Sequence, residues 1–215
     1  MRLRNKPWVK EEIMTYEQLL VHEPEQYKGK WSKEWFKSEQ PIHVELGTGK
    51  GNFITTLAEK YPECNFIGVE LREEVLISAV RKAADKGLKN IAFLWIDINK
   101  IEEIFAEDEI SRVFLNFSDP WPKSRHAKRR LTHRNFLEKY KLILKQGQEI
   151  HLKTDNEKLF EFSLNEFSYT DFRLKNITFD LHQSDFEEAK AVMTEYEQKF
   201  VNLGMKIYRA EAIYL

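Results

Sequence analysis

Short apolar runs alternate with stretches of helical period through most of this 215-residue sequence. The runs Ile42–Leu46, Phe66–Glu70, Ile91–Ile96 and Val113–Phe117 are rich in the β-branched and aromatic residues that favour strands. Between them, apolar residues recur every three or four positions, which is typical of amphipathic helices. A chain that repeats strand, helix and strand forms a parallel sheet covered by helices, so the pattern predicts an α/β fold.

The same alternation continues beyond the fourth run. Apolar residues at helical spacing predict a helix through Phe136–Leu144, and we expect Gly147 to end it. Glu149–Lys153 alternates as a strand does, and the apolar residues after it predict a helix that begins near Asp155. These segments add one strand and two helices to the predicted sheet.

The last third of the chain is expected to place one helix between two strands. Phe172–Leu181 and Met205–Tyr214 have the composition of extended segments. Between them, Ser184 and Glu187 have the spacing of a capping box, and apolar residues up to Phe200 predict a single helix.

Nothing in the sequence marks two independent domains. No linker rich in Pro, Gly or Ser divides it, and it has no internal repeat. We therefore expect one domain over residues 39–215. Residues 1–38 are expected to form a basic N-terminal arm and a helical extension, with Trp31 and Trp35 packed on the core.

Composition limits the environment of the protein. Charged residues make up 32% of the chain, and no apolar stretch approaches the roughly 18 residues of a membrane helix, so we expect no membrane partner. The single cysteine, Cys64, cannot form an intrachain disulfide. Met1–Lys10 is basic, but Glu11 follows where a secretory signal needs an apolar run. We therefore expect a cytoplasmic protein.

A formal net charge of −1 conceals two basic clusters. Lys123–Arg134 contains six Lys and Arg residues and no acid, so the rest of the chain carries −7. Arg2, Arg4, Lys6 and Lys10 form the second cluster. Local cationic fields attract phosphates whatever the overall charge, so both clusters indicate a nucleic-acid partner. A solvated helix face is the alternative interpretation of the longer one.

A glycine-rich loop follows the first predicted strand. Gly47, Gly49 and Gly51 alternate with other residues and let a ligand approach the backbone closely. The loop lacks the Gly-Lys-Ser/Thr ending of a phosphate-binding P-loop, and Asn52 replaces the last glycine of the dinucleotide fingerprint. The sequence therefore fits neither phosphate template, and an ordinary tight turn is the other interpretation.

Three predicted strands end at or near a carboxylate. Glu70 ends the second strand about 20 residues after the loop, where an acid accepts hydrogen bonds from ribose hydroxyls. Glu45, just before the loop, would repel a pyrophosphate but attract an ammonium or sulfonium group. Asp97, after the third strand, can accept from an adenine amine. Together they indicate a cationic nucleoside, S-adenosylmethionine.

The segment Asn116–Pro122 ends the fourth strand, at the sheet edge where open α/β proteins bind ligands. Because proline fixes its own φ and restricts the residue before it, we expect Asp119 and Trp121 to be held in extended geometry. A rigid loop of this kind is suited to holding catalytic residues at the base of an active site. A plain Asp-Pro turn is the alternative.

Five motifs run along nearly the whole chain. They are ELGTGKG (Glu45–Gly51), GVELR (Gly68–Arg72), NFSDPWPKSRHAKRR (Asn116–Arg130), KTDN (Lys153–Asn156) and TEYE (Thr194–Glu197). Through them the sequence resembles the tRNA (guanine-N7-)-methyltransferases, within the class I S-adenosylmethionine-dependent methyltransferases. The resemblance implies a Rossmann-like fold, with a mostly parallel seven-stranded sheet, an antiparallel C-terminal strand and helices on both faces. It also implies methyl transfer from S-adenosylmethionine to N7 of guanosine 46 in the tRNA variable loop.

The resemblance further implies roles for individual residues. The cofactor-binding residues would be Glu45, Gly47, Gly49, Glu70, Asp97 and Asp119, with Asp119 also the catalytic residue. The substrate-binding residues would be Lys123, Asp155, Thr194, Glu195, Tyr196 and Glu197. The RNA-binding residues would be Arg125, His126, Lys128, Arg129 and Arg130. We expect no metal, because the six histidines lack zinc-ligand spacing, and we favour a homodimer.

The chemistry of this reaction asks little of the protein beyond positioning. Guanine N7 has an exposed lone pair and no proton, so its methylation needs no general base. We expect Asp119, with Asp155 nearby, to accept from guanine N1–H and the exocyclic amine and to favour the positive charge that develops. Lys123 could donate to O6 or to a phosphate.

Three other functions compete with this one. A non-catalytic RNA-binding module would use the basic run but leave the acidic strand ends without a role. A nicotinamide-dependent oxidoreductase is disfavoured by Glu45 and by the missing third glycine. A methyltransferase acting on protein or small molecules would have no evident use for Lys123–Arg134.

Overall fold

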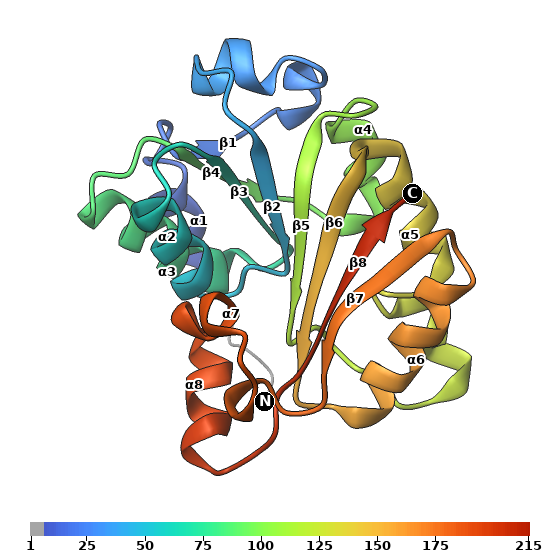
Figure 1. Cartoon of the computed structure of the whole chain (residues 1–215). Helices are drawn as coiled ribbons and strands as arrows, with labels where there is room; N and C mark the ends of the chain where they lie inside the picture. The colour runs from blue at the N-terminus through green and yellow to red at the C-terminus, as the bar shows by residue number, and fades with distance from the viewer. Residues whose placement is uncertain (1–6) are drawn as a thin grey trace. The chain divides into compact units, whose positions relative to one another are not determined.

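The computed structural model describes residues 7–215 and is drawn in Figure 1. The chain forms two compact units, one up to Phe105 and one from Ala106 to Leu215. In the described part of the chain, no helix is both long and apolar enough to span a membrane.

The first unit contains a parallel sheet. Its strands are β1 (Leu20–Val21), β2 (Ile42–Leu46), β3 (Asn65–Glu70) and β4 (Ile91–Trp95). They lie in the order β1-β4-β3-β2, and every neighbouring pair is parallel. The three strands predicted here are confirmed, whereas the two-residue β1 had no signal in the sequence.

Helices connect these strands. They are α1 (Pro7–Ile13), α2 (Asn52–Lys60), α3 (Glu73–Asp85) and α4 (Ile101–Ile104), with the helical turns η1 (Pro24–Tyr27), η2 (Trp31–Phe36) and η3 (Ile98–Lys100). The buried stripes of α2 and α3 are the apolar repeats seen in the sequence, because residues three and four apart share one helix face. Trp31 is fully buried, and its indole Nε1–H donates to Ile104 O over 3.1 Å.

The basic cluster near the N-terminus lies mostly outside the described residues. Arg2, Arg4 and Lys6 are not described, whereas Lys10 is exposed in α1, with its Nζ 5.9 Å from the centre of the Trp95 ring. The domain boundary expected after residue 38 stays a prediction.

The second unit contains a mixed sheet. Its strands are β5 (Ile110–Asn116), β6 (Leu144–Thr154), β7 (Phe172–Thr178) and β8 (Tyr208–Tyr214). The order is β5-β6-β8-β7; β5 and β6 are parallel, whereas β8 runs antiparallel to β6 and β7. The expected strands are all present with one antiparallel C-terminal strand, so the α/β fold class is confirmed. The described residues form eight strands rather than the seven expected, because β1 adds one.

The helices of the second unit fall into two groups. They are α5 (Arg134–Ile143), α6 (Glu157–Ser168), α7 (Glu187–Ala191) and α8 (Glu195–Asn202), with the turns η4 (Ser124–Arg129) and η5 (Leu181–Gln183). In Figure 1, α5 and α6 lie to the right of this unit's strands, and α7 and α8 lie near the lower end of these strands.

Two predictions about how the helices of this unit end are wrong. Gly147 does not end the helix: α5 stops at Ile143, and Gly147 lies inside β6 with φ +82°. The sheet pairs Leu144 with Ile110 and Glu149 with Arg112, so the glycine occupies a bulge. The single helix expected from Ser184 is two helices, because the chain becomes extended at Val192 and restarts at the N-cap Thr194.

Candidate active site

The glycine-rich loop leaves open space above its backbone. Gly47 and Gly49 have φ values of +81° and +59°, which side chains with a Cβ rarely adopt. A Cβ built on Gly47 would meet no atom within 4 Å, and one on Gly49 would meet only a carbonyl oxygen at 4.0 Å. The loop therefore forms an uncrowded cradle that a ligand can approach.

Gly51 has a different reason to be glycine. A Cβ at this position would lie 2.3 Å from the Cβ of Ala79, which no side chain tolerates. Gly51 thus allows the start of α2 to pack against α3. It belongs to the packing of the loop rather than to its open side.

Glu45 is a buried carboxylate at the end of β2. Its residue is 2% exposed, and Thr48 Oγ1 donates to Glu45 Oε2 over 2.6 Å. A carboxylate is rarely buried unless it is hydrogen-bonded or paired with a positive charge. The hydroxyl of Thr48 ties this carboxylate to the glycine loop.

Glu70 is held in place by backbone groups. Its Oε2 accepts from Gly49 N–H over 3.1 Å, and its Oε1 accepts from the N–H groups of Leu71 and Arg72 over 2.9 and 3.1 Å. Each carboxylate oxygen can accept more than one hydrogen bond, so capacity for ligand hydroxyls remains.

Asp97 is exposed and caps η3. Its Oδ1 accepts from the backbone N–H and the side-chain amide of Asn99, over 2.9 and 2.8 Å. Because β2, β3 and β4 are parallel neighbours, Glu45, Glu70 and Asp97 all lie toward the same edge of the first unit's sheet. Three carboxylates at one edge create a negative field that suits a cationic nucleoside.

The loop after β5 differs from the geometry that its prolines suggested. Trp121 has φ +41°, so the prediction that it is extended is wrong. Phe117 also has positive φ, at +51°, and its N–H donates to Lys153 O over 2.9 Å. Asp119 is exposed between them, whereas the hydroxyl of Ser118 is buried and has no hydrogen-bond partner among the described residues.

Asp119 and Asp155 follow two neighbouring strands. In the sheet of the second unit Asn116 pairs with Lys153, and β5 and β6 are parallel, so both acids come after the same edge. Asp155 is half-buried. The two carboxylates therefore follow adjacent strand ends.

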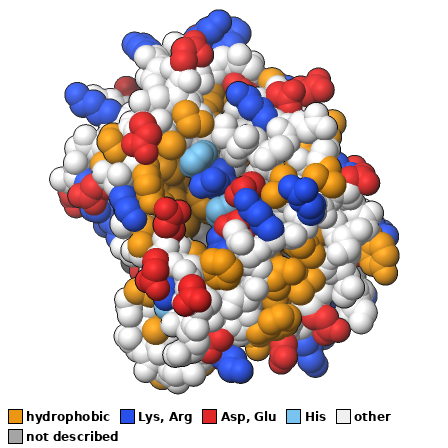
Figure 2. Space-filling model, in the orientation of Figure 1, with side chains coloured by type: hydrophobic (Ala, Val, Ile, Leu, Met, Phe, Trp, Pro, Cys, Tyr) orange, Lys and Arg blue, Asp and Glu red, His pale blue; other side chains and the backbone are white. Residues whose placement is uncertain are grey.

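The basic run forms η4 and the turn around it. Lys123, Arg125, Lys128 and Arg129 are exposed, whereas His126 is half-buried with its ring edge-on to Trp121 at 5.8 Å. The exposed cations keep their charge available for a partner. On the face drawn in Figure 2, acidic and basic side chains are interspersed.

The guanidinium groups of the basic run have different neighbours. Arg129 lies over the Trp121 ring at 4.8 Å, and Arg130 donates to two backbone carbonyls. Arg134 forms a two-bond ion pair with Glu166, and the hydrogen bond from Arg134 lowers the pKa of that carboxyl. The sequence could not separate these roles.

Thr194 and Glu197 form the buried start of α8. Thr194 Oγ1 accepts from Glu197 N–H over 2.9 Å, as an N-cap does. Glu197 is fully buried, and its two carboxylate oxygens accept from Lys153 Nζ over 3.1 and 3.0 Å. In the same motif Glu195 is half-buried and Tyr196 is 62% exposed.

Comparison with known proteins identifies the family. The family described as "Putative methyltransferase" matches residues 39–210. The chain is 54% identical to the tRNA (guanine-N(7)-)-methyltransferase of Brevibacillus brevis, over 99% of this chain and 98% of that one. It is 51% identical to the protein of the same name from Clostridioides difficile, over the same shares. This chain belongs to the tRNA (guanine-N(7)-)-methyltransferase family.

The fold of this chain also matches solved structures of much lower sequence identity. It resembles the 16S rRNA methyltransferase KamB with a TM-score of 0.66 and 12% identity, over 87% of this chain and 95% of that one. A SAM-dependent methyltransferase from Aquifex aeolicus matches with a TM-score of 0.58 and 14% identity, over 99% and 100%. At such low identity the likeness concerns the fold alone.

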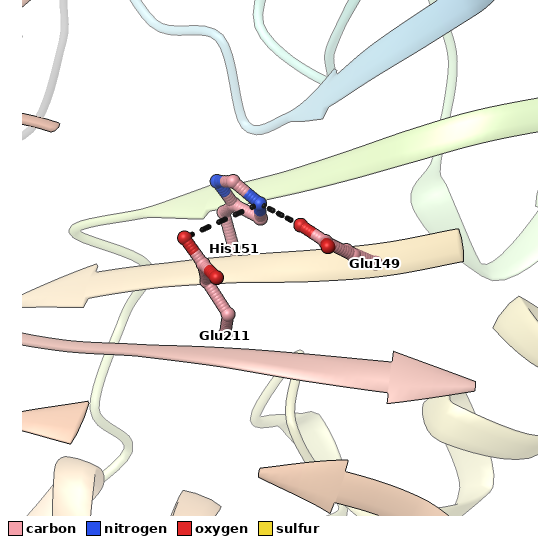
Figure 3. Close-up of side chains that lie close together, drawn as sticks. All are labelled: Glu149, His151 and Glu211. Carbon is pink, nitrogen blue, oxygen red and sulfur yellow. Dashed lines mark hydrogen bonds and ion pairs between the residues drawn. The ribbon is translucent and has the colours of Figure 1, made fainter. Parts of the chain in front are cut away.

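The chain also carries a polar cluster that local sequence patterns did not indicate. Glu149 and His151 on β6 lie beside Glu211 on β8, as Figure 3 shows. His151 Nε2 contacts Glu149 Oε2 over 2.7 Å, and this hydrogen bond lowers the pKa of Glu149 to about 2. In the sequence, only Glu149 and His151 lie close together, two positions apart on one strand. Glu211 is distant from both, so the sequence does not show the cluster.

The cluster has the spacing of a metal site, but its oxygens already have partners. Lys175 Nζ donates to Glu149 Oε1 over 2.5 Å. The other acid, Glu211, accepts from Arg209 and from the side-chain amide of Asn176. Within the described residues this is therefore an ion network in which protein cations neutralise the carboxylates.

Proposed function

We propose that this protein transfers a methyl group from S-adenosylmethionine to N7 of guanosine 46 in the variable loop of tRNA. Identity of about half across 99% of the chain to relatives of that name carries the proposal. The acidic edge of the first unit and the acidic and basic loops of the second support it, because they supply groups for a cationic nucleoside and for RNA.

The fit of the first unit to S-adenosylmethionine rests on its open loop and its acids. When bound, this cofactor supplies an electrophilic methyl group on a sulfonium. Gly47 and Gly49 leave room for it, and Glu70, which accepts from Gly49 N–H, would also accept from its ribose hydroxyls. Asp97 accepts from the adenine amine, and Glu45 provides negative charge for the cationic end.

The second unit orients the purine. Asp119 would contact the base, and with Asp155 it would accept from guanine N1–H and the exocyclic amine. The family resemblance also implies a role for Asp119 in cofactor binding. Since N7 carries no proton, these residues need remove none. Their negative charge stabilises the positive charge that the purine acquires, so their main contributions are orientation and electrostatics.

Other residues bind the rest of the substrate. Lys123 and the segment Thr194–Glu197 hold the nucleotide, with Tyr196 the most exposed member of that segment. The exposed cations Arg125, Lys128 and Arg129 bind tRNA phosphates, together with His126. We further propose that the enzyme acts on tRNA in the cytoplasm, as a homodimer.

The test is methyl transfer to an unmodified tRNA transcript that carries G46. The protein is incubated with methyl-labelled S-adenosylmethionine, and the digested tRNA is analysed for 7-methylguanosine. We expect label in that nucleoside only, and none in a transcript in which A replaces G46. Label in another nucleoside, or none while calorimetry shows no cofactor binding, would contradict the proposal.

A further inference from the structure

Arg130 differs from the other cations of the basic run because its guanidinium donates hydrogen bonds to the backbone of the Asp119 loop. Its Nε–H donates to Pro120 O over 3.0 Å, and its Nη2–H donates to Trp121 O over 3.0 Å. The same guanidinium lies over the ring of Phe162, on α6, at 4.3 Å. Arg130 is thus held between a backbone segment and an aromatic face.

The segment it holds has a conformation that needs support. Trp121 has φ +41°, a region that bulky side chains adopt only when their surroundings enforce it. Pro120 and Pro122 have no N–H, so the loop has few backbone donors for its own carbonyls. A guanidinium carries several donors in a fixed plane and satisfies two neighbouring carbonyls at once.

We propose that Arg130 is a positioning residue, which fixes the loop of Asp119 for methyl transfer, rather than a contact to tRNA phosphate. This inference rests on the proposed function and assigns a new role within it. Arg130 acts through the carbonyls of Pro120 and Trp121, directly after Asp119 in the chain. If these two hydrogen bonds are lost while the positive charge is kept, the loop no longer fixes the position of Asp119, but the electrostatic field around the loop remains.

The adjacent arginine provides the contrast. Arg129 is exposed, and its guanidinium contacts the face of the Trp121 ring at 4.8 Å. Its charge is therefore accessible to a phosphate, whereas the donors of Arg130 serve backbone oxygens. Two consecutive residues of the same type are thus predicted to affect different kinetic constants.

The decisive variant is Arg130→Lys, which keeps the charge but replaces the planar fork with a single ammonium. We expect kcat to fall about tenfold or more, because small misplacements of a catalytic group have large effects. The KM for tRNA and the dependence of tRNA binding on salt should stay near those of the wild type. Arg129→Gln should instead raise that KM and reduce the salt slope by about 1.

Two further measurements separate positioning from damage to the fold. Phe162→Leu removes the ring beneath Arg130 without changing any charge, and we expect a smaller fall in kcat with an unchanged salt slope. Hydrogen exchange of residues 117–123 should be faster in Arg130→Lys and unchanged in Arg129→Gln. Thermal unfolding of each variant shows whether the rest of the chain is intact.

The inference is overturned if Arg130→Lys keeps the wild-type kcat and loop exchange while Arg130→Gln weakens tRNA binding and lowers the salt slope. Arg130 would then be a phosphate contact. Failure of the wild-type protein to form 7-methylguanosine would instead contradict the proposed function. Hydrogen exchange of the loop would still test the hold of Arg130 in that case.

Discussion

The backbone N–H of Gly49 donates a hydrogen bond to Glu70 Oε2 over 3.1 Å, although 21 positions separate the two residues. This bond joins the glycine loop after β2 to the end of β3. Together with the N–H groups of Leu71 and Arg72, it orients the Glu70 carboxylate before any ligand is present. A preorganised carboxylate loses little freedom when it binds ribose hydroxyls.

Glu70→Gln is therefore expected to weaken S-adenosylmethionine binding. The amide has only one acceptor oxygen, and its NH₂ group would face backbone N–H donors. Hydrogen bonds to a charged group contribute about 1.5–3 kcal/mol, so the Kd measured by calorimetry should rise roughly tenfold to a hundredfold. Glu63→Gln, an exposed site before β3, is the control and should leave the Kd unchanged. An unaltered Kd in Glu70→Gln would remove Glu70 from the cofactor site.

Asp119→Asn is expected to lower turnover more than cofactor binding. The substitution keeps the size of the side chain but removes the negative charge that stabilises the methylated purine. Loss of one such electrostatic contact costs roughly 10²–10³ in kcat, which single-turnover assays with saturating tRNA can measure. Asp185→Asn, at an exposed site before α7, is the matched control. Wild-type single-turnover rates in Asp119→Asn would refute the catalytic assignment.

The buried pair of Lys153 and Glu197 ties the start of α8 to the end of β6. Lys153→Met would leave the fully buried Glu197 carboxylate with His182 but without its ammonium partner. Breaking a buried ion pair in this way costs about 3–5 kcal/mol, and we expect that loss in the free energy of unfolding by urea.

A double variant shows whether the loss is specific to the pair. Adding Glu197→Leu to Lys153→Met removes the unpaired charge, so we expect the double variant to regain part of the stability. The exposed Lys158→Met on α6 should stay within about 0.5 kcal/mol of the wild type. The same small change in Lys153→Met would show that the pair contributes little.

Local sequence signals were sufficient for the elements that carry the first half of the site. Strand β2 and the glycine loop were predicted because apolar period and glycine spacing are local properties. Glu70 was placed correctly for the same reason, since it ends a continuous apolar run. Here each residue's environment depends mainly on its near neighbours in the chain.

The remaining features depend on contacts between distant segments. Trp121 has a positive φ, and its carbonyl accepts a hydrogen bond from Arg130. The conformational preferences of proline do not predict a contact of this kind. Gly147 lies in a strand because Leu144 pairs with Ile110, which overrides its tendency to end a helix. The sequence placed Thr194 inside a helix because the helical spacing of apolar residues continues through Val192, where the chain is in fact extended.

The network around His151 predicts how stability depends on pH. Burial lowers the pKa of His151 below its usual 6.5, although Glu149 and Glu211 oppose this, so the folded protein binds the imidazole proton less readily than the unfolded chain does. As the pH falls, the unfolded chain therefore takes up this proton first. The stability that His151 contributes is therefore present above about pH 6.5 and is lost as the pH falls through its lowered pKa.

We expect the free energy of unfolding to decrease between pH 7 and 5, with a slope of up to about 1.4 kcal/mol per pH unit from this one proton. Glu149 stays ionised in this range because its pKa is about 2. His151→Gln removes the titrating group and should reduce the slope, but not abolish it, because burial also lowers the pKa of His133. Urea unfolding at several pH values measures the slope, with the exposed His22→Gln as the control. Equal slopes in His151→Gln and the wild type would show that the buried imidazole is not the source.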